Sequence, residues 1–113
     1  MILHICPRDA WEKALAAGVY DGDTLATDGY IHCSTEQWVH LPATLRFRGR
    51  EDLLLLEIAE DRLPVEVTWE EGDPPHPEGA LFPHLYAALP TAAVVAVHDY
   101  QPNEDGSFSP PNI

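Results

Sequence analysis

The sequence predicts a compact single α+β domain with about six mainly antiparallel strands in a split or curved sheet and two helices in its N-terminal half. Segments with helical periodicity come early in the chain, and segments with strand character dominate its later part. No regular alternation of strands with helices is visible, which disfavours a parallel βαβ arrangement. A chain of 113 residues can form one hydrophobic core, which we assign to residues 1–100.

The first third of the chain predicts a strand, a helix and a second strand. Apolar and polar side chains alternate over residues 2–6, which is typical of a strand. Pro7 favours the start of a helix and Gly18 favours its end. An Asp-Gly turn then leads into a strand over residues 30–33. The apolar face of the helix is expected to consist of Trp11, Ala14 and Leu15.

A second helix is predicted to begin at residues 34–37. In this segment Ser34 and Gln37 form a capping box, in which each side chain satisfies an exposed backbone N–H group. Pro42 limits or kinks the middle of this helix. The apolar face of the helix is expected to consist of Trp38, Leu41 and Leu45.

Four further strands are predicted in the second half of the chain. The nearly continuous apolar run at residues 53–58 indicates a central strand that is covered on both faces. Residues 65–70 alternate as a strand, and the last two strands span residues 81–86 and 93–100. The inward face of the strand over residues 65–70 is expected to consist of Val65, Val67 and Trp69.

Two segments rich in proline and acidic residues are predicted to lie outside the regular elements. Residues 71–79 form an exposed loop in this prediction, because their prolines are incompatible with a helix or a central strand. Residues 101–113 are predicted to be a poorly ordered C-terminal tail, unless Phe108 docks this segment on the domain.

Composition and charge narrow the choice of partners. The formal net charge of −13 repels phosphate backbones, so nucleic acid is disfavoured. The longest apolar runs, residues 53–56 and 92–97, are too short to span a membrane, and the N-terminus has no signal-peptide pattern. We therefore expect a cytoplasmic protein with reduced cysteines, whose partner is a small-molecule ligand or a nucleotide.

Histidine is the most informative residue type, because three of the six histidines lie in separate predicted strands. These three are His4, His32 and His84. If their strands are neighbours, the imidazoles hold hydroxyl groups in one cleft and nearby aromatic rings stack on a planar ligand. In the alternative interpretation each histidine makes only a buried hydrogen bond. The period of two places further side chains on the faces of His32 and His84, namely Tyr30, Ser34 and Tyr86.

Half of the cationic side chains lie close together, at Arg46, Arg48 and Arg50. In one interpretation they form an anion clamp for a carboxylate or a pyrophosphate. In the other, which we prefer, they complement the end of the second helix and protect the following apolar run from aggregation.

The residue types indicate three other candidate groups. Glu57 and Glu70 are the candidate catalytic carboxylates, because both lie within predicted strands. Cys6 precedes a predicted helix, where a helix dipole can activate a thiol, although a neutral cap or small core residue is the preferred interpretation. A zinc site is rejected, because the adjacent His32 and Cys33 point to opposite faces of a strand.

Five segments in fixed order carry a resemblance to a known family: LHICPRDAW, LATDGYIHCSTEQ, LLLLEI, VTWEEG and LFPHLYAALP. They cover about residues 2–97, nearly the whole expected domain. In this pattern the chain resembles the bacterial domain-of-unknown-function family 952. The resemblance implies an ADP-ribosyltransferase-like fold, similar to that of the group that includes RNA 2′-phosphotransferases, and NAD as a substrate.

The same resemblance implies roles for the three strand histidines. In the ADP-ribosyltransferase pattern a first-strand histidine holds the ribose of NAD, and His4 matches this position. His32, beside Tyr30, matches the group that flanks nicotinamide. At the third position the pattern has a glutamate that stabilises positive charge on the sugar, and this chain has His84 there. A histidine at this position is similar to the phosphotransferase branch, whereas it argues against ADP-ribosyl transfer.

Three hypotheses of function result. The first is a protein that binds a nucleotide or NAD-derived ligand in a cleft lined by histidine and tyrosine, with transferase activity through His4, His32 and His84. The second is a non-catalytic module that binds a ligand or another protein. The third is a glutathione or thiol transferase that acts through Cys6. In the first hypothesis the ligand-binding residues are Tyr30, Ser34, Tyr86, Arg46, Arg48 and Arg50.

Overall fold

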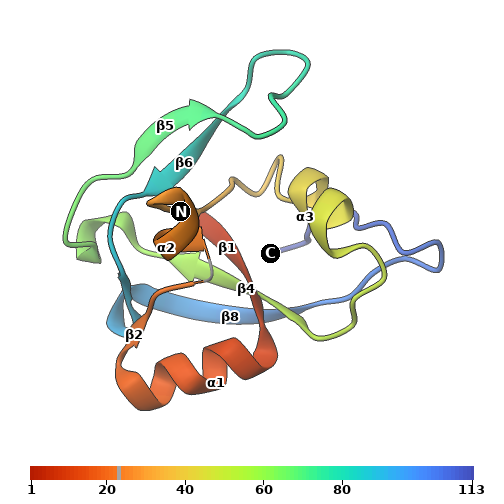
Figure 1. Ribbon diagram of the computed structural model, residues 1–113. Helices are drawn as coiled ribbons and strands as arrows, with labels where there is room; N and C mark the ends of the chain where they lie inside the picture. The colour runs from red at the N-terminus through yellow and green to blue at the C-terminus, as the bar shows by residue number, and fades with distance from the viewer. Residues whose placement is uncertain (23) are drawn as a thin grey trace.

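Three α-helices and eight strands, all paired antiparallel, make up the fold of residues 1–22 and 24–113, which the computed structural model describes (Figure 1). None of the helices in these residues is long and apolar enough to cross a membrane. The helices are α1 (Arg8–Ala17), α2 (Thr24–Asp28) and α3 (His40–Phe47). The strands are β1 (Ile2–Pro7), β2 (Val19–Tyr20), β3 (Ile31–His32), β4 (Leu53–Ile58), β5 (Thr68–Glu71), β6 (Leu81–Leu85), β7 (Leu89–Pro90) and β8 (Val94–Tyr100).

The strands form three separate sheets. β4 is the middle strand of β1-β4-β8, β6 is the middle strand of β3-β6-β5, and β2 pairs with β7. The predicted α+β class with antiparallel pairing is confirmed. The predicted count of six strands and two helices is too low, because β2, β7 and α2 are too short to show a periodic pattern.

Strand β4 carries the hydrophobic core on both of its faces. One buried cluster contains Leu54, Leu56 and Ile58, and a second contains Leu53 and Leu55. Because β1 and β8 flank β4 and its leucines are buried on both sides, the prediction of a doubly covered central strand is confirmed.

The alternation predicted for β1 agrees with the core packing. Ile2 and Cys6 belong to the first cluster, whereas Leu3 and Ile5 belong to the second. His4 lies midway between Ile2 and Cys6, so the period of two turns it to the side of the first cluster.

Helix α1 ends where the sequence predicts. Gly18 adopts a φ of 80°, and its N–H donates to the carbonyl oxygen of Ala14 (2.8 Å). Trp11 and Ala14 are buried as expected, but Leu15 is 57% exposed, so its assignment to the buried face is wrong. The helix therefore packs on the domain along a narrow stripe.

Helix α3 begins later than the capping-box pattern predicts. It starts at His40, and no side chain caps it, so the predicted capping box is wrong. Ser34 instead exchanges two backbone hydrogen bonds with Leu3 of β1 (2.8 and 2.7 Å). This tertiary pairing holds the backbone of Ser34 in a β-bridge and overrides the local helix signal.

The apolar face of α3 also differs from the predicted one. Val39 and Ala43 are fully buried, whereas Leu41 and Leu45 are 39% and 61% exposed. The two leucines line a cavity instead of joining the core. The periodicity of the segment was sufficient to place them on one face, but that face is turned to the cavity.

Strand β5 is shorter than predicted, and of the three side chains expected on its inward face only Val67, which precedes the strand, packs against the core. Trp69 is 45% exposed, so its predicted inward position is wrong, and Val65 precedes the strand and is 43% exposed. Glu70 lies on the side of His84, to which it is hydrogen-bonded. β5 is an edge strand, and its inner neighbours at this point are polar site residues, so the rule that apolar side chains point inward fails here.

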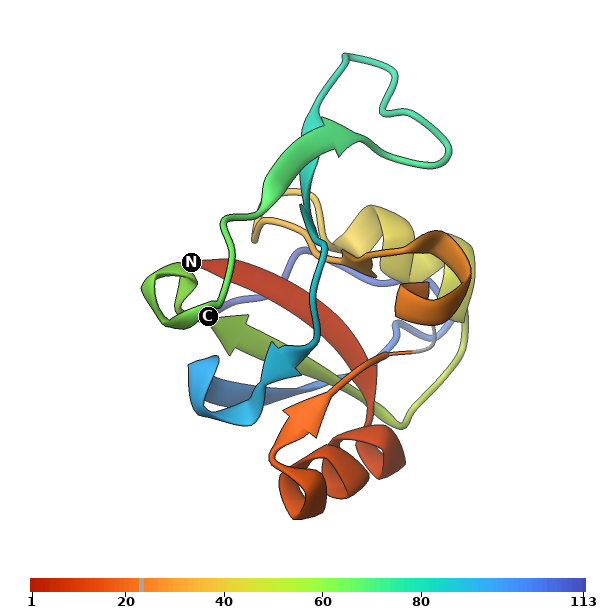
Figure 2. The same cartoon turned by 60° about the vertical axis from the view of Figure 1, so that its left-hand side comes forward.

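Two segments without regular structure behave differently from each other. The proline-rich loop between β5 and β6 is mostly exposed, as predicted, and extends away from the main sheet (Figure 2). The C-terminal segment docks through Phe108, which is 4% exposed and lies 4.9 Å from the ring of Tyr100. The backbone N–H of Phe108 donates to the hydroxyl oxygen of Thr44 (2.9 Å).

The substitution Phe108→Ala is expected to lower the free energy of unfolding by about 3 kcal/mol, because it removes a buried aromatic ring. Chemical denaturation measures this change. Ile113→Ala is the control: Ile113 is 41% exposed, and its substitution is expected to change stability by less than about 0.5 kcal/mol. Equal effects of the two substitutions would contradict docking through Phe108.

Candidate functional site

A cavity of about 910 Å³ is walled by β1, α1, α3, β3, β6 and the loop between β5 and β6. This size lies at the upper end for ligand pockets, which hold roughly 300–1,000 Å³. Of the predicted site residues, three do not line it: Tyr30, Tyr86 and Arg48. Six line it: His4, His32, His84, Ser34, Arg46 and Arg50.

Both ring nitrogens of His4 have partners within the protein. Nδ1 lies 2.5 Å from the carbonyl oxygen of His32, and Nε2 lies 2.9 Å from the hydroxyl of Tyr20. A carbonyl oxygen only accepts, so Nδ1 carries a proton and donates it. In the neutral imidazole Nε2 then accepts from Tyr20. His4 therefore positions β3 and Tyr20, and Tyr20 presents the hydroxyl at this part of the cavity wall.

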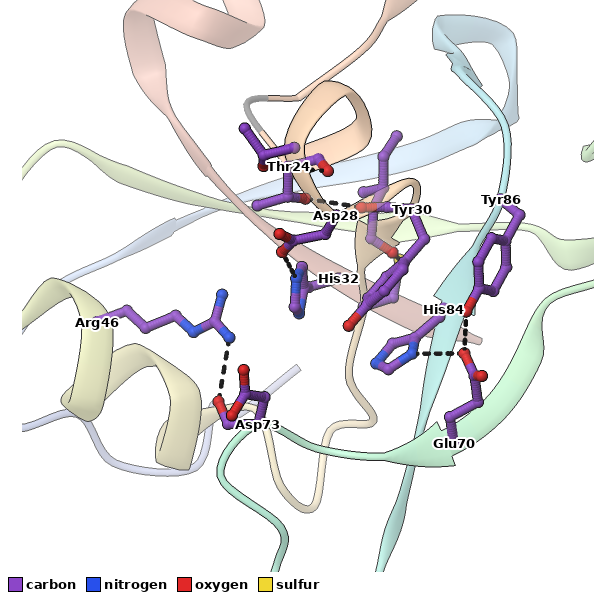
Figure 3. Close-up of polar contacts among 12 residues, drawn as sticks. Thr24, Asp28, Tyr30, His32, Arg46, Glu70, Asp73, His84 and Tyr86 are labelled. Atoms are coloured by element: carbon purple, nitrogen blue, oxygen red, sulfur yellow. Dashed lines mark hydrogen bonds and ion pairs between the residues drawn. The ribbon is translucent and has the colours of Figure 1, made fainter.

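The other two histidines each pair with a carboxylate, as Figure 3 shows. His32 Nε2 lies 2.8 Å from Asp28, and His84 Nδ1 lies 2.9 Å from Glu70. An ionised carboxylate only accepts, so these two nitrogens are the donors. In the neutral rings His32 Nδ1 and His84 Nε2 are then acceptors. The rings of His32 and His84 are 5.5 Å apart.

The electrostatics of these pairs keep the carboxylates ionised. The hydrogen bond from His32 lowers the pKa of Asp28, and those from Tyr86 and His84 lower the pKa of Glu70. Burial lowers the pKa of His32 and outweighs the opposing effect of Asp28. His32 is therefore neutral at pH 7, with Nδ1 as an acceptor.

Tyr30 covers the histidine pair rather than leaving a free ring for a ligand. Its ring is stacked on His84 at 4.1 Å, and it lies 4.6 Å from His32 and 5.1 Å from Tyr86. The Tyr86 hydroxyl donates to Glu70 (2.6 Å). Both tyrosines thus support the imidazoles, and neither lines the cavity.

The three clustered arginines diverge. Arg46 lines the cavity, and its Nη2 donates to the carbonyl oxygen of Asp73 (3.2 Å) in the loop between β5 and β6. Arg50 also lines the cavity and is paired with Asp52 through two hydrogen bonds (2.9 and 2.6 Å). Arg48 donates to the carbonyl oxygen of Asp105 (3.1 Å), outside the cavity. A clamp of all three arginines is therefore not formed.

The second candidate carboxylate, Glu57, lies elsewhere. It pairs with His98 across β4 and β8 and does not line the cavity. Glu70 is hydrogen-bonded to His84, although it does not line the cavity either.

Neither cysteine supports thiol chemistry. Cys6 is fully buried, its Sγ donates to the carbonyl oxygen of Pro7 (3.3 Å), and it does not line the cavity. Burial raises the pKa of Cys33 to about 12, so its thiol is protonated at neutral pH. The thiol-transferase hypothesis has no reactive group in this structure.

Asp28 and Tyr20 belong to the site but were absent from the sequence-predicted set. In the sequence Asp28 is typical of a turn, and only its position four residues before His32 indicates that the two side chains can pair. Tyr20 lies on a two-residue strand that has no sequence signal. Among the described residues no group of three or more histidine, cysteine or acidic side chains is arranged to hold a metal ion.

Fold and site together define a small α+β domain with a cavity lined by strand histidines. The model of the family described as "Protein of unknown function (DUF952)" matches residues 5–97, so the chain belongs to this family.

Solved structures of protein CC0527 from Caulobacter crescentus are similar to this chain. Its crystal structure is 31% identical, covers 96% of this chain and 92% of its own, and has a TM-score of 0.83. Its solution NMR structure is also 31% identical, covers 96% and 90%, and has a TM-score of 0.78. A crystal structure of a double mutant is 30% identical, covers 96% and 92%, and has a TM-score of 0.82. No curated protein was found to match.

The hydrogen bond from Tyr86 to Glu70 has a measurable consequence. The ionised carboxylate stabilises the neutral phenol and raises the pKa of Tyr86 from 10.0 to about 12. Glu70→Gln is expected to return this pKa toward 10, because the negative charge is lost. The phenolate absorbance in a pH titration measures the shift.

Burial raises the pKa of Tyr100 to about 12 as well, so Tyr86→Phe is needed as the reference that isolates the Tyr86 signal. An unchanged late titration of Tyr86 in the Glu70→Gln variant would contradict the assigned hydrogen bond.

Proposed function

We propose that the cavity binds a nucleotide or an NAD-derived ligand, in a domain with an ADP-ribosyltransferase-like fold. The observation that carries the proposal is the convergence of His4, His32 and His84, from three strands, on one cavity. The order of these histidines along the chain is the order that the family resemblance implies. Two of them offer acceptor nitrogens whose tautomers are fixed by carboxylates.

The histidine end of the cavity suits a ribose. Its hydroxyl groups donate to His32 Nδ1 and His84 Nε2, because these nitrogens are acceptors in the neutral rings. His4 acts through Tyr20, whose hydroxyl it orients. The flat base lies against Phe82, which lines the cavity beside His84.

Arg46 suits a phosphate. Its guanidinium donates to a neutral carbonyl oxygen, that of Asp73. A phosphate oxygen is a stronger acceptor for a guanidinium than a carbonyl and accepts two parallel hydrogen bonds. Binding therefore exchanges a weaker contact of Arg46 for a charge-assisted one.

Thermal unfolding in the presence of NAD, ADP-ribose or nicotinamide tests the proposal. A ligand at a hundred times its dissociation constant stabilises the fold by about 2.7 kcal/mol. Arg46→Gln is expected to weaken ADP-ribose binding by about tenfold, because one charge-assisted contact is lost. Arg48→Gln is the matched control, since Arg48 lies in the same arginine cluster but outside the cavity.

The proposal fails if none of the three ligands shifts the unfolding transition. It also fails if Arg46→Gln and Arg48→Gln weaken binding equally, because the phosphate contact is then absent.

A second candidate function, ADP-ribosyl transfer, is favoured by the contact between Glu70 and His84. The carboxylate that the resemblance places on the later strand is supplied here from the neighbouring strand β5. In this reaction the bond from ribose C1′ to nicotinamide breaks, and nicotinamide leaves with the electron pair. C1′ then bonds to the acceptor oxygen, whose proton passes to His84 Nε2. Glu70 does not line the cavity and acts through His84, because its carboxylate stabilises the positive charge that the imidazole gains with this proton.

Incubation with NAD and chromatography of released nicotinamide test this step, with water as the acceptor. Glu70→Gln is expected to reduce the release at least about a hundredfold while ligand affinity is retained. Ligand binding without any release contradicts the transferase and supports the non-catalytic binding module.

A further inference from the structure

The cavity continues beyond the histidines toward helices α1 and α3. In Figure 1 α1 lies below β1 and α3 lies to its right, and both helices contribute lining residues. The α1 wall is formed mainly by small side chains, those of Ala10, Ala14 and Ala17. Small side chains on a helix leave space in front of it, so this half of the cavity is apolar and open.

Two leucines of α3 face this space and keep much of their surface exposed. Leu41 and Leu45 line the cavity and are 39% and 61% exposed, although Ala43 between them is fully buried. The helix thus has a core side and an uncovered apolar side. Covering exposed leucine surface is favourable, so an apolar group is stabilised here.

Charge identifies the kind of apolar group. Three of the six cationic side chains of the chain line the cavity, but only two of the nineteen acidic ones do so among the described residues. Arg46 lies near the histidines. Lys13 and Arg50 flank the apolar half. There the N–H of Arg8 at the start of α1 donates to the carbonyl oxygen of Asp52 (2.8 Å), so the start of α1 lies close to the segment that carries Arg50. Arg50 shares its charge with Asp52, so Lys13 is the main cation.

We infer that the half of the cavity between α1 and α3 is a separate subsite for an apolar group that carries a negative charge, such as an acyl chain with a carboxylate or phosphate. The apolar part lies against Leu41, Leu45 and the alanines of α1, and the anionic part faces Lys13. The inference deepens the proposed function, because it defines the ligand as a nucleotide-like part joined to an apolar acid, but it does not depend on nucleotide binding.

Titration calorimetry with octanoate, below its micelle concentration, tests the subsite. Octanoate is expected to bind saturably, octanol more weakly by at least about threefold, and octylammonium more weakly than octanol, because Lys13 attracts a negative charge and repels a positive one. Leu45→Gln is expected to weaken octanoate binding about fivefold through lost apolar contact. Lys13→Gln is expected to weaken it about threefold.

Two matched variants serve as controls. Leu15 of α1 is as exposed as Leu45, at 57% against 61%, but does not line the cavity, so Leu15→Gln is expected to leave binding unchanged. Arg62→Gln removes a cation outside the cavity and is also expected to have no effect. No saturable octanoate binding, equal binding of octylammonium, or equal losses in the control variants would overturn the inference.

ADP-ribose is titrated into the same variants to separate the two proposals. Octanoate binding without ADP-ribose binding keeps the subsite and removes the proposed nucleotide function. ADP-ribose binding without octanoate binding does the reverse. Loss of octanoate affinity in Lys13→Gln together with unchanged octanoate affinity in Arg46→Gln supports two distinct halves of the cavity.

Discussion

One buried imidazole joins the three sheets of this fold. His4 lies on β1 of the main sheet, its Nδ1 bonds the carbonyl oxygen of His32 on β3, and its Nε2 bonds the hydroxyl of Tyr20 on β2. Leaving such a buried group unpaired costs about 1–3 kcal/mol, so the two contacts strongly favour this one arrangement. The cavity wall follows from it, because His4, Tyr20 and His32 all line the cavity.

The strong acidity of the chain has a local function at this junction. Asp28 and Glu70 each accept a hydrogen bond from one ring nitrogen of a histidine. Each carboxylate thereby fixes the tautomer of its histidine, so that the other ring nitrogen is an acceptor. The cations are distributed differently, since half of them line the cavity. The site therefore combines acceptor nitrogens with locally positive surroundings inside a strongly negative protein, a combination that the net charge alone does not reveal.

Sequence patterns predicted the parts of the fold that depend on local periodicity and missed those that depend on neighbours. The central strand at residues 53–58 follows from a nearly continuous apolar run, and the facing of His4 follows from side-chain alternation. Ser34 was missed because its backbone pairs with Leu3 of β1, which is distant in the sequence. This pairing prevents Ser34 from capping a helix. Trp69 faces outward because β5 borders polar site residues. The divergence of Arg48 from its neighbours depends on where the C-terminal segment docks.

Trp38 packs against the loop that closes one end of the cavity. Its ring lies 4.4 Å from that of His76, and His76 lines the cavity. The other two tryptophans lie elsewhere. Trp11 belongs to α1 and its side chain is buried, and Trp69 lies on β5 and is exposed to solvent. An imidazole next to an indole alters its fluorescence, and a protonated imidazole quenches it. The protein thus carries an intrinsic optical reporter beside its cavity, and a ligand that displaces His76 changes the emission of Trp38 without any added dye.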